Sequence, residues 1–78
     1  MGNEWHELKK ARIEAGMTQQ DLAYKAGMTL AQLSQYETGR ADVYNMRIKT
    51  LLCLAKVLRK TLDELLGSRL QEVQIRDD

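Results

Sequence analysis

Apolar residues recur with the period of an α-helix in five stretches of the chain. The first stretch covers residues 4–15, and one of its faces holds residues three or four positions apart: Trp5, Leu8, Arg12 and Ala15. Glycines follow the helical stretches at four places: Gly16, Gly27, Gly39 and Gly67. Glycine is favoured just past a helix end because it readily adopts the left-handed conformation that closes the last turn. The pattern therefore predicts an all-α fold built from short helices.

Two short helices are predicted next, each preceded by a threonine that can cap it. Thr18 begins the first helix, and Asp21 stands three residues later, as in a capping box. Thr29 begins the second helix, which extends to Glu37. The face expected in the core consists of Leu33 and Tyr36, and the face expected at the surface consists of Leu30, Ala31, Ser34 and Gln35.

The most apolar stretch, residues 45–58, predicts a fourth helix that is buried at the centre of the domain. Its apolar stripe is wide and comprises Ile48, Leu51, Leu52, Ala55 and Leu58. Three further residues broaden the stripe almost to the full circumference: Cys53, Leu54 and Val57. A fifth short helix is expected after Thr61, because this threonine and Glu64 repeat the capping-box pattern.

Length and composition favour one small globular domain. The chain has 78 residues, of which 44% are apolar and 29% charged, and we place the domain at residues 1–67 and a tail at residues 68–78. The formal net charge of +1 does not by itself indicate a nucleic-acid or membrane partner. No apolar run approaches the roughly 18–20 residues that cross a bilayer, and the first residues lack the apolar core of a signal peptide. We therefore expect a cytoplasmic protein with no membrane association.

The residue types that carry catalysis or bind metals are scarce. Cys53, the single cysteine, lies in the most apolar helix, where we expect it to pack as a small hydrophobic side chain rather than to sense redox state. Together with His6, the single histidine, it provides too few ligands for a structural zinc site. No acid, base or nucleophile pair stands at a motif spacing. We expect no enzymatic activity, no metal and no cofactor.

The order and spacing of the predicted elements carry a family resemblance. The stretch from Leu8 to Gly67 contains TQQDLAYKAGMTLAQLSQYETGR followed by TLLCLAKVLRKTLDELLG. It resembles the lambda-repressor-like helix-turn-helix family, which includes phage repressors, Cro proteins and Xre-type regulators. The resemblance implies a compact five-helix domain with the helix-turn-helix at helices two and three. It further implies a bacterial or phage-encoded transcriptional regulator that binds double-stranded DNA as a homodimer, on an inverted-repeat operator.

The resemblance also implies which residues touch DNA when the family pattern is carried onto this chain. The base-contacting set on the third helix is Leu30, Ala31, Ser34 and Gln35. The backbone-contacting set is Gln19, Thr29, Gln32, Thr38 and Arg40. We expect Gln35 to be the main base reader, because glutamine can bond bidentately to adenine N6 and N7. The third helix has no Lys or Arg between residues 29 and 37, so readout of guanine by arginine is not expected.

Two further expectations concern structure rather than DNA. Arg12 lies on an apolar stripe and needs an acidic partner; the resemblance places Glu37 there, as a structural ion pair. A candidate dimer surface consists of Leu62, Leu66, Leu70, Val73 and Ile75, because the apolar residues of the tail have little core left to join.

Two alternative functions stay open beside the repressor. One is an antitoxin or a restriction-modification controller, in which a small DNA-binding domain also controls a partner protein. The other is a protein-interaction module that keeps the fold without operator recognition, suggested by the near-neutral charge and the absence of basic residues from the third helix. No small-molecule ligand is expected for any of these functions.

Overall fold

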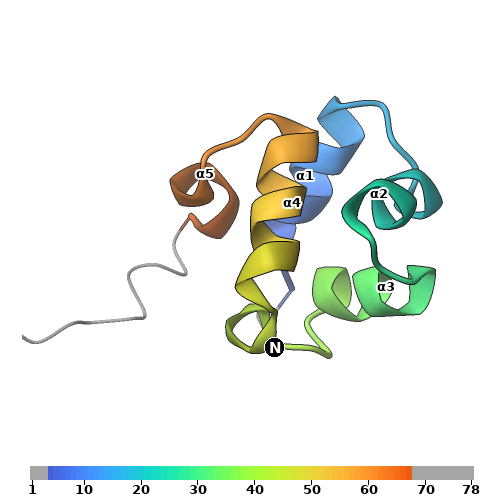
Figure 1. Ribbon diagram of the computed structural model, residues 1–78, viewed down its shortest axis with the longest axis vertical. Coiled ribbons are helices and arrows are strands. Elements are labelled where there is room, and N and C mark those ends of the chain that lie inside the picture. The colour runs from blue at the N-terminus through green and yellow to red at the C-terminus, as the bar shows by residue number, and fades with distance from the viewer. Residues whose placement is uncertain (1–3, 68–78) are drawn as a thin grey trace, which may run out of the picture.

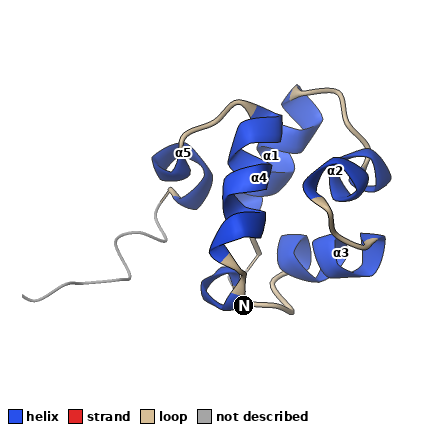
Figure 2. Cartoon of the chain, in the orientation of Figure 1, coloured by secondary structure: helices blue, strands red, loops and turns tan. Residues whose placement is uncertain are grey.

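The computed structural model describes residues 4–67, which form five α-helices and one short 3-10 helix (Figure 1). The elements in chain order are α1 (His6–Glu14), α2 (Gln19–Ala26), α3 (Leu30–Thr38), η1 (Val43–Asn45), α4 (Ile48–Leu58) and α5 (Leu62–Leu66). No strand occurs in this part of the chain (Figure 2). The predicted all-α fold with five helices is therefore confirmed.

The helices enclose one apolar core. In Figure 1, α2 and α3 lie to one side of α4, and α5 lies to the other. α2 packs against both α3 and α4, whereas α5 packs against α1 and α4. The largest fully buried side chains come from every α-helix and from the residue before α1: Trp5, Leu8, Leu22, Leu33, Leu54 and Leu65. Residues far apart in the sequence thus hold the two sides of the domain together.

Trp5 links three parts of the chain from its position just before α1. Its indole Nε1 donates a hydrogen bond of 2.7 Å to the carbonyl oxygen of Leu65 in α5. Its backbone N–H donates to the carbonyl oxygen of Glu37 in α3 at 3.2 Å. The predicted inward position of Ala15 is wrong, because α1 ends at Glu14 and Ala15 is exposed; Ala11, one turn earlier, is buried instead.

Threonines cap three of the helices. Thr18 Oγ1 accepts a hydrogen bond from the backbone N–H of Asp21 at 3.1 Å, and the Asp21 carboxylate accepts one from the backbone N–H of Thr18 at 3.2 Å. The same reciprocal pair joins Thr61 and Glu64 at α5. The predicted caps at α2, α3 and α5 are confirmed. These backbone hydrogen bonds lower the pKa of Asp21 and that of Glu64 because they stabilise the charged carboxylates.

α4 differs from the prediction in both length and burial. It begins at Ile48 rather than near Asn45, which belongs to η1. Its buried face is narrow and consists of Leu51, Leu54, Ala55 and Leu58. Ile48 and Leu52, which we expected inside, are 63% and 50% exposed, and Cys53 is only partly buried. A domain this small has too few helices to surround its central helix on all sides.

The expected dimer surface at the end of the chain also needs correction. Leu66 is buried in the core, and Leu62 is partly buried against it. Leu66 is therefore unavailable as a contact surface, because α5 turns it toward α1 and α4. The other members of that set, Leu70, Val73 and Ile75, lie outside the described residues.

Candidate nucleic-acid interface

α2 and α3 are joined by a three-residue turn, Gly27 to Thr29. Gly27 has φ 72°, in the left-handed region, and a Cβ placed there would meet no atom within 4 Å. The conformation rather than a lack of space therefore favours glycine at this position. Met28 follows, and its N–H donates to the carbonyl oxygen of Ala23 at 2.8 Å. These contacts fix how α3 leaves α2.

The predicted base-contacting residues share the outward side of α3. Leu33 is fully buried and Tyr36 packs against the core, so the residues on the opposite side face outward. Of that outward set, Leu30 is 47% exposed, Ala31 and Gln35 are exposed, and Ser34 is partly buried. Within residues 4–67, no group hydrogen-bonds the Gln35 side-chain amide. Both its donor and its acceptor are therefore available to an external partner.

The predicted backbone-contacting residues lie around both ends of α3 and at the start of α2. Thr29 and Gln32 cap the N-terminus of α3, where Gln32 Oε1 accepts from the Thr29 N–H at 3.1 Å. The Thr38 hydroxyl donates to the carbonyl oxygen of Ser34 at 2.8 Å, at the C-terminal end. Arg40 follows α3 and is exposed. The capping role of Gln32 was not anticipated, although its position three residues after Thr29 is that of a capping box.

A buried ionic cluster holds α3 against α1 and α2. Arg12 Nε lies 2.7 Å from Glu37 Oε2, and Arg12 Nη2 lies 3.3 Å from Glu37 Oε1. Arg12 Nη1 donates to the carbonyl oxygen of Met17 at 2.9 Å, and Gln19 Nε2 donates to Glu37 Oε1 at 3.0 Å. Glu37 is only 4% exposed. Its carboxylate therefore accepts three hydrogen bonds from two helices, which offset the loss of water.

Gln19 has a structural contact that the sequence analysis did not foresee. We expected it to face a DNA phosphate, whereas its amide nitrogen is already bonded to the Glu37 carboxylate. A sequence signal was present, because Gln19 stands four and seven residues before the buried Ala23 and Ala26 and so lies on the same side of α2. One amide N–H of Gln19 remains for another acceptor.

A sequence model of a helix-turn-helix family matches residues 8–65. The chain belongs to the lambda-repressor-like helix-turn-helix family. No curated protein and no solved structure matches the chain. Membership in this helix-turn-helix family supports a DNA-binding regulator. Within the matched residues, α2 and α3 are the helix-turn-helix pair.

Positive charge in this helix-turn-helix domain lies beside α3 rather than on it. α3 itself contains no lysine or arginine. Four exposed cations come from the neighbouring segments: Lys25, Arg40, Arg47 and Lys49. Arg47 also lines a cavity of about 330 Å³ that lies beside the α2–α3 turn and includes Gln32 and Tyr36. Exposed cationic side chains therefore border the α3 surface.

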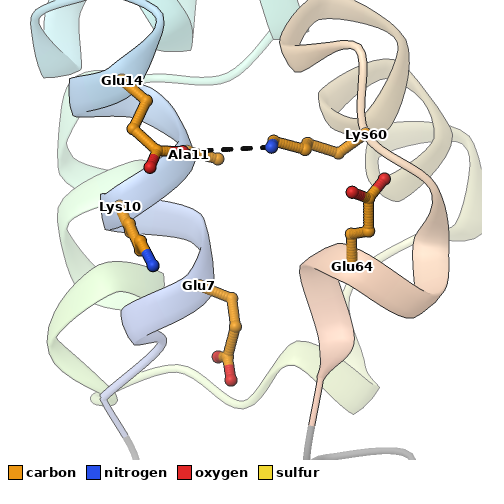
Figure 3. Close-up of a pocket in the computed structure, with 6 residues that line it drawn as sticks. All are labelled: Glu7, Lys10, Ala11, Glu14, Lys60 and Glu64. Atoms are coloured by element: carbon orange, nitrogen blue, oxygen red, sulfur yellow. Dashed lines mark ion pairs between the residues drawn. The ribbon is translucent and has the colours of Figure 1, made fainter.

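A second hollow lies between α1 and α5, apart from the α3 surface (Figure 3). It measures about 320 Å³ and is lined by Glu7, Lys10, Ala11, Glu14, Lys60 and Glu64. Lys60 reaches across it to within 3.9 Å of a Glu14 carboxylate oxygen. Its carboxylates and ammonium groups largely offset one another. Within residues 4–67, no group of three His, Cys, Asp or Glu side chains is arranged to hold a metal ion.

No helix among residues 4–67 has the length and apolar character needed to cross a bilayer.

Proposed function

We propose that the protein is a sequence-specific transcriptional repressor of the Xre or Cro type, which reads the DNA major groove with α3. The observation that carries the proposal is the outward side of α3, which presents an uncommitted glutamine amide and two apolar side chains. The Arg12–Glu37–Gln19 cluster supports it because this cluster fixes α3 relative to α1 and α2. A rigid recognition helix loses little entropy when it enters the groove.

The base contacts follow from the chemistry of the exposed residues. Gln35 can pair bidentately with adenine, a contact that provides about 1–3 kcal/mol of discrimination against other bases. Leu30 and Ala31 offer apolar surface to a thymine methyl group, and Ser34 can bond to either kind of base edge. This combination favours operators with A·T pairs beneath α3, since no cationic side chain on the helix can read guanine.

The backbone contacts position the domain on the duplex without selecting a sequence. Arg40 supplies a full positive charge next to the C-terminal end of α3. Gln19, Thr29 and Gln32 supply neutral donors, of which the remaining N–H of Gln19 is held in place by Glu37. The Thr38 hydroxyl already donates to the Ser34 carbonyl and would have to exchange that bond for one to phosphate. Contacts to phosphate of this kind fix register and orientation.

We further propose that residues 1–67 are the DNA-binding unit and that two copies bind an inverted repeat in the cytoplasm. Half-sites about one helical turn apart, roughly 34 Å, would match the two recognition helices of a symmetric dimer. Repression then results from occupancy of the operator. The operator sequence is to be identified by selecting binding sites from a pool of DNA duplexes.

Selection of binding sites from randomised duplexes tests the proposal. The expected result is an inverted repeat bound at least about 10³-fold more tightly than a scrambled duplex at physiological salt. Gln35→Ala should relax the preference at one base position of each half-site, whereas Gln20→Ala, at an exposed position of α2, should leave the preference unchanged. If the selection enriches no motif and scrambled DNA binds equally well, the proposal that the protein is a repressor is overturned.

A second candidate is a protein-interaction module that keeps the fold without operator recognition. The absence of lysine and arginine from α3 favours it, because DNA-reading helices gain much of their affinity from such charges. Weak binding without sequence preference in the same selection would support this candidate.

A further inference from the structure

A hollow beside the α2–α3 turn adjoins a second hollow between α2 and α4. The first measures about 330 Å³ and is lined by the turn, one side of α3 and the segment from η1 to α4. The second measures about 440 Å³ and is lined by the C-terminal end of α2 and the first two turns of α4. The hollows adjoin because Gly27 and Thr50 line both of them. We name the two together the turn groove.

The turn groove is open at the point where its two hollows meet. A Cβ placed on Gly27 would meet no atom within 4 Å. An extended polypeptide can therefore cross Gly27 and occupy both hollows at once. The groove lies beside α3 rather than on its outward side, because Gln32 and Tyr36 line it, whereas the predicted base-contacting residues do not.

Among residues 4–67, the turn groove is lined by three cations and by no carboxylate. Arg47 lines the first hollow, and Lys25 and Lys49 line the second. All three are exposed, and both ion pairs within the described part of the chain involve other side chains. The hollow between α1 and α5, in contrast, is lined by three glutamates as well as two lysines. The turn groove therefore has the charge that an anionic occupant requires.

The neutral side chains of the turn groove are of the kinds that form contacts between proteins. Met28, Tyr36 and Met46 line the first hollow and are partly buried. Tyr24 lines the second hollow and is 86% exposed. Tyrosine, methionine and arginine are enriched at protein–protein interfaces, and methionine adapts its shape to its neighbours. Contacts to a DNA backbone consist mainly of hydrogen bonds to phosphate and sugar, so this lining favours a polypeptide.

We propose that the turn groove binds a short acidic segment of a partner protein. Carboxylates of the segment pair with Arg47 in one hollow and with Lys25 and Lys49 in the other. The planar guanidinium of Arg47 can hold a carboxylate with two hydrogen bonds. An apolar side chain of the segment packs between Met28 and Met46 in the first hollow. Charge thus steers the segment into the groove, and the methionines add apolar contact.

An acidic segment in the turn groove opposes DNA binding, a consequence that rests on the proposed function. Gln32 lines the groove and also belongs to the predicted backbone-contacting set. The bound segment neutralises cations that border α3 and adds negative charge beside that helix, which repels phosphate. A partner protein that carries such a segment would release the repressor from its operator.

Fluorescence anisotropy of a labelled peptide tests the turn groove without DNA. The probe is a short peptide of alternating aspartate and glutamate with one central phenylalanine, and its control carries asparagine and glutamine in place of the acids. The full chain should bind the acidic peptide and not the control. The variant K25Q/R47Q/K49Q should bind the acidic peptide about tenfold less tightly, because each exposed ion pair contributes modestly. If the acidic peptide does not bind, the proposal is wrong.

The variant K9Q/K56Q/R59Q is the matched control for charge. It removes the same number of positive charges, at exposed positions that do not line the turn groove. It should bind the acidic peptide like the unaltered protein, because distant exposed charges are screened at physiological salt. Circular dichroism establishes that both variants are folded. Equal losses of affinity in the two variants would assign the binding to net charge and overturn the proposal.

Amide chemical shifts of the isotopically labelled protein locate the bound peptide. They should change at the α2–α3 turn and at the start of α4, and they should stay unchanged at Ala31 and Gln35 on the outward side of α3. The alternative occupant is a DNA backbone, probed with a duplex of scrambled sequence. If the peptide shifts no amide of the groove while K25Q/R47Q/K49Q loses affinity for this duplex, the groove is a phosphate-contacting surface and the proposal fails.

Competition between the peptide and the selected operator separates this inference from the proposed function. Saturating acidic peptide should lower the operator affinity of the unaltered protein about tenfold or more, because it cancels cations near phosphate. The affinity of K25Q/R47Q/K49Q should not change with peptide. If the peptide binds but leaves operator affinity unchanged, its opposition to DNA binding is refuted. If the protein binds no DNA selectively, the repressor proposal fails, and anisotropy still decides whether the turn groove binds an acidic segment.

Discussion

Replacing Arg12 with methionine tests whether the buried cluster fixes α3. The substitution removes two hydrogen bonds to Glu37 and one to the Met17 carbonyl, and it leaves Glu37 with only the Gln19 amide. Because Glu37 is 4% exposed, water replaces the lost donors poorly. Removing one partner of a buried ion pair costs about 3–5 kcal/mol. A domain of this length has a free energy of unfolding of only about 4–12 kcal/mol, so Arg12→Met should remove a large part of it.

The reverse and double substitutions should behave differently, which makes the prediction specific. Glu37→Met leaves Arg12 with the Met17 carbonyl, and the long arginine side chain can move its charge toward water. It should therefore cost less than Arg12→Met. The double variant R12M/E37M removes both charges and should lie within about 1–2 kcal/mol of the unaltered protein, since well-packed apolar replacements of buried ion pairs are often neutral.

Urea unfolding followed by tryptophan fluorescence provides the assay. Trp5 is the single tryptophan and is 1% exposed, so its emission reports loss of the core directly. Arg40→Met, at an exposed position, serves as the control and should change the free energy of unfolding by no more than about 0.5 kcal/mol. A loss below about 1 kcal/mol for Arg12→Met, or a double variant that equals the sum of the single losses, would refute the coupling of α1 to α3 through Glu37.

Three other properties of the domain can be predicted from local structure. Gly27→Ala should destabilise the domain by about 1 kcal/mol in the same urea assay, because φ is 72° but no atom obstructs the new Cβ; a loss above about 3 kcal/mol would indicate a clash instead. The lowered pKa values of Asp21 and Glu64 mean that their caps stabilise the fold fully above the unfolded pKa values near 3.8 and 4.5, and that this contribution is lost as pH falls through the folded values. Thermal unfolding between pH 6 and pH 3 should therefore show a smaller decrease for a D21N/E64Q variant than for the unaltered protein, and equal decreases would contradict the assignment. Arg40→Ala should reduce the slope of log affinity against log salt by about one unit without changing base preference, as measured by fluorescence anisotropy; an altered preference would assign Arg40 to base reading.

The sequence predicted the structure best where a feature depends only on residues that are close together in the chain. Thr18 and Thr61, each followed three residues later by a carboxylate, specified two helix starts because their capping boxes depend on neighbours in the chain alone. Burial on α4 was predicted less well. Ile48 and Leu52 have the spacing of a core face, but whether an apolar residue is covered depends on which helices pack around α4, and periodicity does not contain that information.

The candidate interface shows the same division between local and tertiary information. The outward position of Gln35 followed from helical spacing, because Leu33 and Tyr36 define the opposite face. The contact of Gln19 with Glu37 joins residues 18 positions apart and depends on how α2 crosses α3. The spacing of Gln19 from Ala23 and Ala26 predicts that Gln19 lies on the buried side of α2, but it does not predict that Glu37 is its partner.

The absence of lysine and arginine from α3 has a consequence for regulation. α3 itself adds nothing to phosphate attraction in a proposed half-site contact, because it contains no lysine or arginine; the attraction comes from the cations that border it. One proposed half-site contact then holds a single copy weakly, whereas two copies joined on an inverted repeat bind the same duplex together and reinforce each other. Operator occupancy should therefore rise steeply with protein concentration, which lets the amount of protein itself act as the regulatory signal.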